Sequence, residues 1–292
     1  MFYKPIMMDA LSDYESSTYV IFGVPFDATS SYRSGSRWAP DAMRKASLNF
    51  ESYNHFYKID LQDLAIHDSG NFEISASIDE TLHDLLVTVR SVVSDNKIPI
   101  MLGGEHSMSL PCIKACAENA GNDFGVLVLD AHLDLRDEYA GVKYNHACVS
   151  RHILEEVTEN YVTVGVRSGA GEEWDLARDR NICHYTPEDV ARKGIDGVAD
   201  EIMDYLDCSR IYISLDMDVF DPAYAPGLGT PEPFGMNPWD VRKLIHRFAP
   251  MSIGFDIVEI APEYDSGQAA ILGAKIMREF IAASASKNKK IQ

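Results

Sequence analysis

The sequence predicts an α/β fold of three layers, with a mainly parallel central sheet covered by helices on both faces. Short apolar, β-branched runs recur along the chain, and longer segments with helical spacing lie between them. Because this alternation requires right-handed crossovers, we expect consecutive strands to run parallel. Near-uniform composition, without a linker or an internal repeat, predicts a single domain over residues 1–292.

The strands are predicted from apolar runs that suit burial on both faces of a sheet. These runs cover residues 19–26, 98–104, 124–131, 161–167, 211–219 and 252–260. The predicted helices cover residues 77–93, 187–206, 237–248 and 267–283. Ser77 with Glu80 three residues later, and Asn237 before Pro238, are typical of helix starts. We expect the tail SASKNKKIQ, from residue 284, to fray.

The charge balance is strongly acidic, with 26 basic against 45 acidic residues and a formal net charge of −19. Nucleic-acid binders draw most of their affinity from clustered Lys and Arg, so a nucleic-acid partner is not expected. A cationic small molecule would be attracted instead. The N-terminus lacks the pattern of a secretory signal, and no run approaches the ~20 apolar residues of a membrane span. We therefore expect a cytoplasmic protein with no membrane partner.

The five cysteines form an odd set without a C-x-x-C pair, which predicts reduced, mostly buried thiols. Cys112 and Cys116 lie four residues apart in a predicted helix, on one face. Because no second pair accompanies them, core packing is favoured over half a metal site.

Several strand ends change abruptly from apolar to polar residues, and in such sheets ligands bind beyond the carboxyl ends of the strands. In VLVLDAHLD, the alternate residues Asp130, His132 and Asp134 share one side if the backbone stays extended. In ISLDMD, the alternate residues Asp216 and Asp218 likewise share one side. These acids and imidazoles are therefore expected to converge.

A third strand end, GGEHS, has two glycines that permit a tight strand-to-helix turn presenting His106. Four aspartates buried side by side would cost many kcal/mol or take up protons unless cations balance them. Two divalent ions would do so, with one imidazole for each ion. The oxygen-rich, thiolate-free set suits Mn²⁺, with Zn²⁺, Co²⁺ or Ni²⁺ as plausible replacements. A metal pair about 3.5–4 Å apart can convert a bridging water into hydroxide, so hydrolysis is the predicted reaction class.

In this order, the segments GGEHS, DAHLD and SLDMDVFDPAYAPG resemble the ureohydrolase family, which includes arginase, agmatinase and related guanidino-compound hydrolases. SYRSGSRWAPDAMRKAS, GVRSGAGEE and DIVEIAPEYD also look like family segments, so the resemblance covers most of the chain. It implies an arginase-like three-layer fold, two Mn²⁺ ions per subunit and release of urea. The implied metal ligands are His106, Asp130, His132, Asp134, Asp216 and Asp218. Glu105 departs from the family, which commonly has Asp at this position. Because this residue is not an expected metal ligand, the departure does not change the implied ligand set.

The resemblance also implies a mechanism, in which a metal-bridging hydroxide attacks the guanidinium carbon and the intermediate collapses to urea and an amine. Glu259 resembles the carboxylate that pairs with the guanidinium group. His146 corresponds to a histidine proposed as a proton shuttle, a role that requires titration near neutral pH. Asp134 is expected to serve both as a ligand and as hydrogen-bond acceptor for the hydroxide. Thr230 is expected either to contact the substrate or to cap local backbone.

Three alternatives stay open at this point. Cys148 lies two residues from His146, which would suit a thiolate nucleophile, although such an enzyme would not need the acidic and imidazole cluster. A binuclear phosphoesterase also uses D-x-H clusters, but its usual G-N-H and G-D-x-x-D-R segments are absent from the sequence. A non-enzymatic, metal-binding regulatory scaffold would bind manganese and release no urea.

The substrate is predicted to be agmatine, a dication without a carboxylate. Arginases resemble one another in an Arg-Asp-x-Asp segment that reads the substrate α-amino group, whereas residues 167–170 here are RSGA. The extra acids Asp137 and Glu138 would disfavour a substrate carboxylate. Arginine and guanidinobutyrate remain alternatives, because Arg136 or Lys143 could accept a carboxylate. Ureohydrolases often form trimers or hexamers, so a homo-oligomer is expected.

Overall fold

The computed structural model describes residues 6–286, and the lysines of the predicted tail lie outside the described residues. Within this range, the strands of the main sheet coincide with the six predicted apolar runs and add two more. They are β1 (Tyr19–Val24), β4 (Ile66–Asn71), β5 (Ile98–Gly103), β6 (Gly125–Leu129), β7 (Tyr161–Val164), β8 (Cys183–Tyr185), β9 (Ile211–Asp216) and β10 (Ser252–Val258). A separate antiparallel pair is formed by β2 (Tyr53–Asn54) and β3 (Ile59–Asp60).

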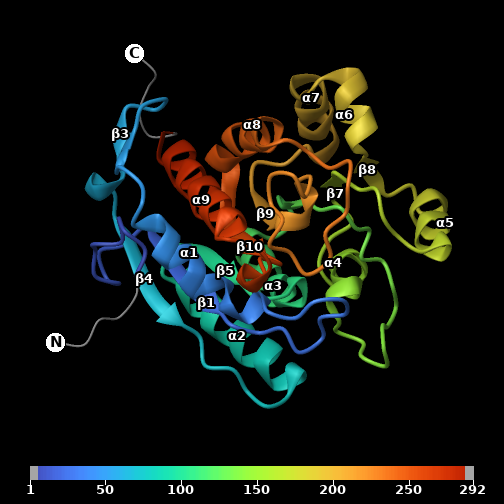
Figure 1. Ribbon diagram of the computed structural model, residues 1–292, viewed down its shortest axis with the longest axis horizontal. Helices are drawn as coiled ribbons and strands as arrows, with labels where there is room; N and C mark the ends of the chain where they lie inside the picture. The colour runs from blue at the N-terminus through green and yellow to red at the C-terminus, as the bar shows by residue number, and fades with distance from the viewer. Residues whose placement is uncertain (1–5, 287–292) are drawn as a thin grey trace.

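The main sheet has the strand order β4-β1-β5-β10-β9-β6-β7-β8, so β4 and β8 are its edges (Figure 1). Every pairing between its described strands is parallel. Successive strands therefore all end at the same side of the sheet. The prediction of a mainly parallel sheet is confirmed.

Helices cover both faces of the sheet and complete the predicted three layers (Figure 1). In one layer lie α1 (Ala39–Ser47), α6 (Pro187–Lys193), α7 (Ile195–Leu206), α8 (Pro238–Phe248) and α9 (Gln268–Ser286). In the other lie α2 (Ile78–Ser94), α3 (Ser109–Ala120), α4 (Val149–Glu156) and α5 (Gly171–Asp179). Each layer encloses its own apolar cluster, because alternate strand residues such as Leu127 and Val128 point to opposite faces.

The structure corrects three details of the helix prediction. The segment predicted as one helix over 187–206 is two helices, separated at Gly194 with φ 76°. The Ser77 side chain makes no capping hydrogen bond, whereas Asn237 accepts from two backbone N–H groups at the start of α8. The helix α9 continues to Ser286, so the first residues of the tail predicted to fray are helical. Among the described helices, none has the length and hydropathy needed to cross a membrane.

The four strands in the middle of the sheet are β5, β10, β9 and β6, in that spatial order. The chain fills these positions out of sequence order, because β6 lies beyond β9 and β10 rather than beside β5. The strand order thus reverses in the centre of the sheet, which is where α/β sheets of this kind form a crevice for ligands. The predicted site residues follow these four strands.

Candidate active site

The turn after β5 presents His106 as the GGEHS motif predicts. Gly104 is required there, because a Cβ at this position would lie 1.8 Å from the carbonyl oxygen of Phe26. His106 then opens a short 3-10 helix and is buried. Its Nε2 lies 3.0 Å from Oγ of Ser214, which donates its own proton to Asp256 at 2.7 Å. In the neutral ring Nε2 must therefore be the donor, which leaves the lone pair of Nδ1 facing the site.

The segment after β6 brings Asp130, His132 and Asp134 to the site, but not as an extended strand. The strand ends at Leu129, and Asp134 has a left-handed backbone with φ 50°. The expectation that simple alternation places these three side chains is therefore wrong. Non-glycine residues with positive φ are uncommon and recur at functional sites.

Asp216 and Asp218 also converge without an extended backbone between them. β9 ends at Asp216, and residues Met217–Val219 form a 3-10 helix. Asp216 accepts a hydrogen bond from the backbone N–H of Asp218 at 2.9 Å and so caps this turn. One carboxylate oxygen of Asp218 accepts from the N–H of Ala131 at 3.0 Å, which joins the ends of β9 and β6.

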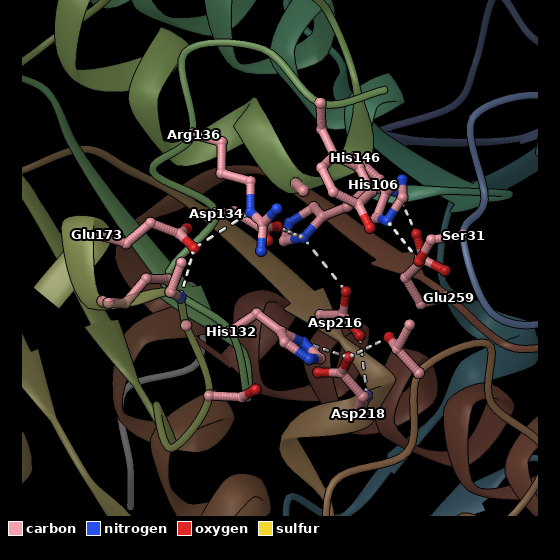
Figure 2. Close-up of a pocket in the computed structure, with 17 residues that line it drawn as sticks. Ser31, His106, His132, Asp134, Arg136, His146, Glu173, Asp216, Asp218 and Glu259 are labelled. Atoms are coloured by element: carbon pink, nitrogen blue, oxygen red, sulfur yellow. Dashed lines mark hydrogen bonds and ion pairs between the residues drawn. The ribbon is translucent and has the colours of Figure 1, made fainter. Parts of the chain in front are cut away.

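The side chains from these three strand ends meet as two overlapping groups. Figure 2 shows four of their members, His106, His132, Asp216 and Asp218. His106, Asp130 and Asp216 form one group, and Asp130, His132 and Asp218 form the other, with potential ligand atoms all within 4.8 Å of one another in each. Asp130 belongs to both. Nδ1 of His106 lies 3.1 Å from Asp130 and 3.2 Å from Asp216, and Nδ1 of His132 lies 2.8 Å from Asp218.

Asp134 lies beside the first group, with Oδ2 3.4 Å from Nδ1 of His106. The structure therefore brings together the six residues predicted as metal ligands.

The electrostatics of this cluster are those of a site with too much negative charge. Burial, together with the charges of Asp218 and Asp130, raises the pKa of Asp216 well above its ordinary value. Burial and the charge of Asp130 raise the pKa of Asp134 to about 7. Burial opposes protonation of His106, but the surrounding aspartates outweigh it and raise the pKa of His106 well above normal. Without cations, protons must compensate the clustered carboxylates.

The donor set fits divalent cations. Nδ1 of His106 and Oδ2 of Asp130 are buried and have no hydrogen-bond partner among the described residues. Such orphaned atoms are costly unless a ligand satisfies them. Carboxylate oxygens and imidazole nitrogens, with no thiolate in either group, are suited to Mn²⁺ and related ions.

Glu259 follows β10 and reaches the same cavity, with a left-handed backbone of φ 65°. Its Oε1 accepts a hydrogen bond from the backbone N–H of His106 at 2.8 Å. Burial and the charge of Glu105 raise the pKa of Glu259 to about 8. A cation bound beside Glu259 would favour the ionised form of this carboxyl group, because an opposite charge nearby lowers its pKa.

His146 faces the cavity from the loop before α4, beside Ser31 (Figure 2). Its Nε2 lies 3.4 Å from Oγ of Ser31, and its Nδ1 lies 3.2 Å from Oγ1 of Thr29. Burial, with the positive charges of His132 and His106, lowers the pKa of His146 to about 4. This value is below the near-neutral titration expected for a shuttle, so His146 is uncharged at neutral pH and can accept a proton.

The cavity has a volume of about 330 Å³ and extends away from the cluster toward a wall that the sequence only partly predicted. This wall includes residues 168–170, Arg136, Tyr139 and Glu173. Glu173 was not predicted as a site residue, although it ends the family-like segment GVRSGAGEE and lies in α5. It is buried, accepts from the backbone N–H of Leu135 at 2.9 Å, and pairs with Nε of Arg136 at 3.3 Å.

Asp137 and Glu138, which were predicted to disfavour a substrate carboxylate, are not placed to contact a ligand in the cavity. Both side chains are exposed and neither lines the cavity. Lys143 is also exposed, and its ammonium group lies over the ring of Tyr144. Of the predicted carboxylate-binding cations, only Arg136 lines the described cavity.

Thr230 lines the cavity and donates to Asp218 at 3.1 Å instead of capping local backbone. Cys148 is buried and does not line the cavity, and burial raises the pKa of its thiol to about 11. The thiolate alternative is therefore not supported. Cys112 and Cys116 are both buried in the apolar cluster around α3, as core packing predicts.

Comparisons with known proteins agree with this architecture. A family model described as the arginase family matches residues 17–283. An agmatinase from Pyrococcus horikoshii is 37% identical over 277 residues, which cover 94% of each chain. An N(1)-aminopropylagmatine ureohydrolase from Thermococcus kodakarensis is 36% identical over 283 residues, covering 93% of this chain and 92% of the relative.

Among solved structures, the agmatine ureohydrolase of Thermoplasma volcanium superposes with a TM-score of 0.94 at 43% identity. The alignment covers 100% of this chain and 98% of that one. The chain therefore belongs to the arginase family and is a ureohydrolase enzyme.

Proposed function

We propose that the enzyme hydrolyses agmatine to putrescine and urea. The observation that carries this proposal is the convergence of four aspartates, two imidazoles and Glu259 at one end of a cavity whose far wall offers no unpaired cation among the described lining residues. Relatives named agmatinase support the same substrate. The family assignment also answers the phosphoesterase and scaffold alternatives, because it makes the chain a ureohydrolase.

Two Mn²⁺ ions per subunit are the proposed cofactors. His106, Asp130, Asp134 and Asp216 would hold one ion, and Asp130, His132 and Asp218 the other. When bound, such ions supply Lewis-acid activation of water. The chain itself supplies rigid ligands, because each carboxylate that would bind an ion is buried at a strand end.

Glu259 is proposed to hold the guanidinium group. A carboxylate and a guanidinium are planar and match in two parallel hydrogen bonds, which would fix the orientation of the guanidinium carbon. Asp134 would accept a hydrogen bond from the attacking water as well as bind an ion. His146, neutral and beside Ser31, would take up a proton only transiently, because its pKa is lowered to about 4, and would deliver it to the leaving amine.

The far end of agmatine is an ammonium group, and the wall around α5 is proposed to receive it. Arg136 is neutralised there by Glu173 and lies over the ring of Tyr139 at 4.4 Å, so this wall carries no free positive charge. Guanidinobutyrate is the second candidate, because donors of Arg136 that Glu173 does not use face the same cavity. The relative from Thermococcus kodakarensis makes N(1)-aminopropylagmatine a third substrate worth testing.

Urea release from agmatine, arginine, guanidinobutyrate and N(1)-aminopropylagmatine tests the proposal. Each substrate is assayed in parallel with Mn²⁺ and after chelation. We expect agmatine to give the highest kcat/KM, and chelation to abolish turnover until Mn²⁺ is returned. A higher kcat/KM for another substrate would replace agmatine as the proposed substrate, and undiminished turnover after chelation would contradict the metal assignment.

We further propose that residues 1–292 act as one ureohydrolase domain, that the protein is a homo-oligomeric trimer or hexamer, and that it works in the cytoplasm. Light scattering measures the oligomer, and cell fractionation measures the location. A monomer in solution would contradict the proposed homo-oligomer.

A further inference from the structure

Glu105 is the residue at which the GGEHS segment departs from the family, and nothing proposed above uses it. It is fully buried, yet it belongs to neither group of potential metal ligands and does not line the cavity. A buried carboxylate of this kind requires hydrogen-bond donors. The donors that the structure provides connect it to His146.

Three donors converge on the Glu105 carboxylate. Oε2 accepts from the backbone N–H of Thr29 at 2.8 Å. Oε1 accepts from the hydroxyl of Thr29 at 2.5 Å and from the hydroxyl of Ser107 at 2.6 Å. Since a carboxylate is only an acceptor, both hydroxyl protons point toward Glu105.

The hydroxyl of Thr29 also contacts both the ring and the backbone of His146. Its Oγ1 lies 3.2 Å from Nδ1 of the ring and accepts from the backbone N–H of His146 at 3.2 Å. A hydroxyl has one proton, and the Thr29 hydroxyl already donates it in the hydrogen bond to Glu105. Toward the ring it can act only as an acceptor, so Nδ1 must carry the hydrogen of this bond.

We propose that Glu105, acting through Thr29, holds neutral His146 as the Nδ1–H tautomer. Glu105 is then a positioning residue, and the lone pair of Nε2 is left on the side of the ring that approaches Ser31 and the cavity (Figure 2). In this tautomer Nε2 accepts a proton, and in the other tautomer it would present an N–H instead. The consequence for catalysis rests on the proposed function, but the tautomer itself does not.

The substitution Glu105→Gln tests the direction of the hydrogen bonds. The amide oxygen must face the backbone N–H of Thr29, so the NH₂ group must face the Thr29 hydroxyl. That hydroxyl then accepts from Gln and donates to Nδ1 of His146. In the variant, the hydrogen bonds between residue 105 and the Thr29 hydroxyl, and between that hydroxyl and Nδ1 of His146, thus both change direction. The ring hydrogen then moves to Nε2, with almost no change of side-chain volume.

Neutron diffraction from crystals of the full chain exchanged into D₂O at pH 8 reads the position of this hydrogen, which ordinary X-ray data do not show. We expect deuterium on Nδ1 of His146 in the native protein and on Nε2 in E105Q. Ser107→Ala removes another donor to Oε1 without touching Thr29, and it should leave deuterium on Nδ1. Deuterium on Nε2 in the native protein, or on Nδ1 in E105Q, would overturn the proposal. Because neither measurement involves turnover, an incorrect substrate would leave both results unchanged.

Kinetics give a second measurement that remains available if E105Q does not fold. Thr29→Val removes the acceptor for Nδ1 and keeps the side-chain shape, whereas Thr29→Ser keeps the hydroxyl. We expect T29V to lower kcat about 10²-fold with little change in KM, and T29S to restore most of kcat. Equal kcat values for T29V and T29S would show that the hydroxyl does not hold the ring.

Discussion

Glu259 accepts a hydrogen bond from the backbone N–H of His106 at 2.8 Å, which links the carboxylate after β10 to the histidine after β5. The backbone N–H of Glu259 in turn donates to the carbonyl of Gly104 at 2.9 Å. The two strand ends therefore hold each other, and the backbone that presents one candidate ligand also orients the proposed guanidinium-binding carboxylate.

The first prediction concerns Gly104→Ala. The added Cβ would meet backbone atoms of Phe26, which cannot rotate away, so the segments after β1 and β5 must move apart. We expect a loss of about 3 kcal/mol or more in the free energy of unfolding, together with loss of activity. Gly171→Ala is the control, because a Cβ there has no atom within 4 Å. Denaturant unfolding of the two variants should differ clearly, and similar stabilities would refute the steric account.

Glu259→Gln should separate binding from folding. The amide oxygen can still accept from the N–H of His106, but the charge that would hold a guanidinium is gone. We expect kcat/KM for agmatine to fall about 10²–10³-fold while the melting temperature stays close to that of the native protein. Glu263→Gln is the control, since Glu263 is exposed and does not line the cavity. A variant with native kcat/KM would remove Glu259 from the proposed mechanism.

The number of bound Mn²⁺ ions should depend on whether the substituted residue belongs to one or to both groups of potential metal ligands. Because Asp130 belongs to both, Asp130→Asn should bind neither Mn²⁺ ion tightly, whereas Asp218→Asn should lose one ion and retain the other. Elemental analysis after gel filtration measures the ions per subunit. Chelation should also lower the melting temperature of the native protein, since it leaves the carboxylates uncompensated. Two tightly held ions in Asp130→Asn would disprove the shared role.

Stability at acid pH should depend on Glu279, which lies in α9 outside the site. Burial opposes its ionisation, but His246, Arg242 and Lys275 outweigh burial and lower the pKa of Glu279 to about 2. A depressed carboxyl pKa stabilises the fold above the unfolded value of about 4.3, and this contribution is lost as the pH falls toward 2. Glu279→Gln should therefore cost about 1–3 kcal/mol at pH 7, and less with each step below pH 4.

Urea unfolding between pH 7 and pH 3 measures whether the stability difference between Glu279→Gln and the native protein shrinks as the pH falls. Glu138→Gln is a suitable control, because Glu138 is exposed. A difference from the native protein that is constant over this range would contradict the assigned pKa.

Arg136→Met addresses substrate choice. If a guanidino acid binds through Arg136, its kcat/KM should fall at least about tenfold in this variant, because a charge-assisted hydrogen bond is lost. The kcat/KM for agmatine should hold or rise, since Glu173 is left without its partner at the same wall. Parallel urea assays on agmatine and guanidinobutyrate decide this, and an equal loss for both substrates would argue against Arg136 as the reader of the far end.

The apolar strands and the strand-end ligands could be predicted from sequence because each depends on local pattern. β4 was missed because its segment IHDSGN is polar, with Asp68 buried in it. That burial is compensated by Arg44, whose Nε and Nη2 each donate to Asp68 at 2.9 Å. A pairing between residues so far apart in the chain has no local signal.

The same reason explains what was missed in the site. Glu173 and Ser31 lie in family-like segments, but their contacts, like those of Thr29, are with partners on other elements, so the sequence did not reveal their roles. The backbone at Asp134 and Glu259 is left-handed, a conformation that is uncommon for residues other than glycine, although Asp adopts it more readily than Glu. Motif spacing therefore identified these two residues but not the geometry that orients them.

The contiguity of β5, β10, β9 and β6 in the middle of the sheet has a consequence for local opening. Backbone amides in these strands are hydrogen-bonded on both sides and covered by two helical layers, whereas β4 and β8 are edges. Slow hydrogen–deuterium exchange should therefore concentrate in the strands that carry the site, and fraying should begin at the two edges. The reactive end of the molecule would then stay assembled through fluctuations that already loosen its periphery.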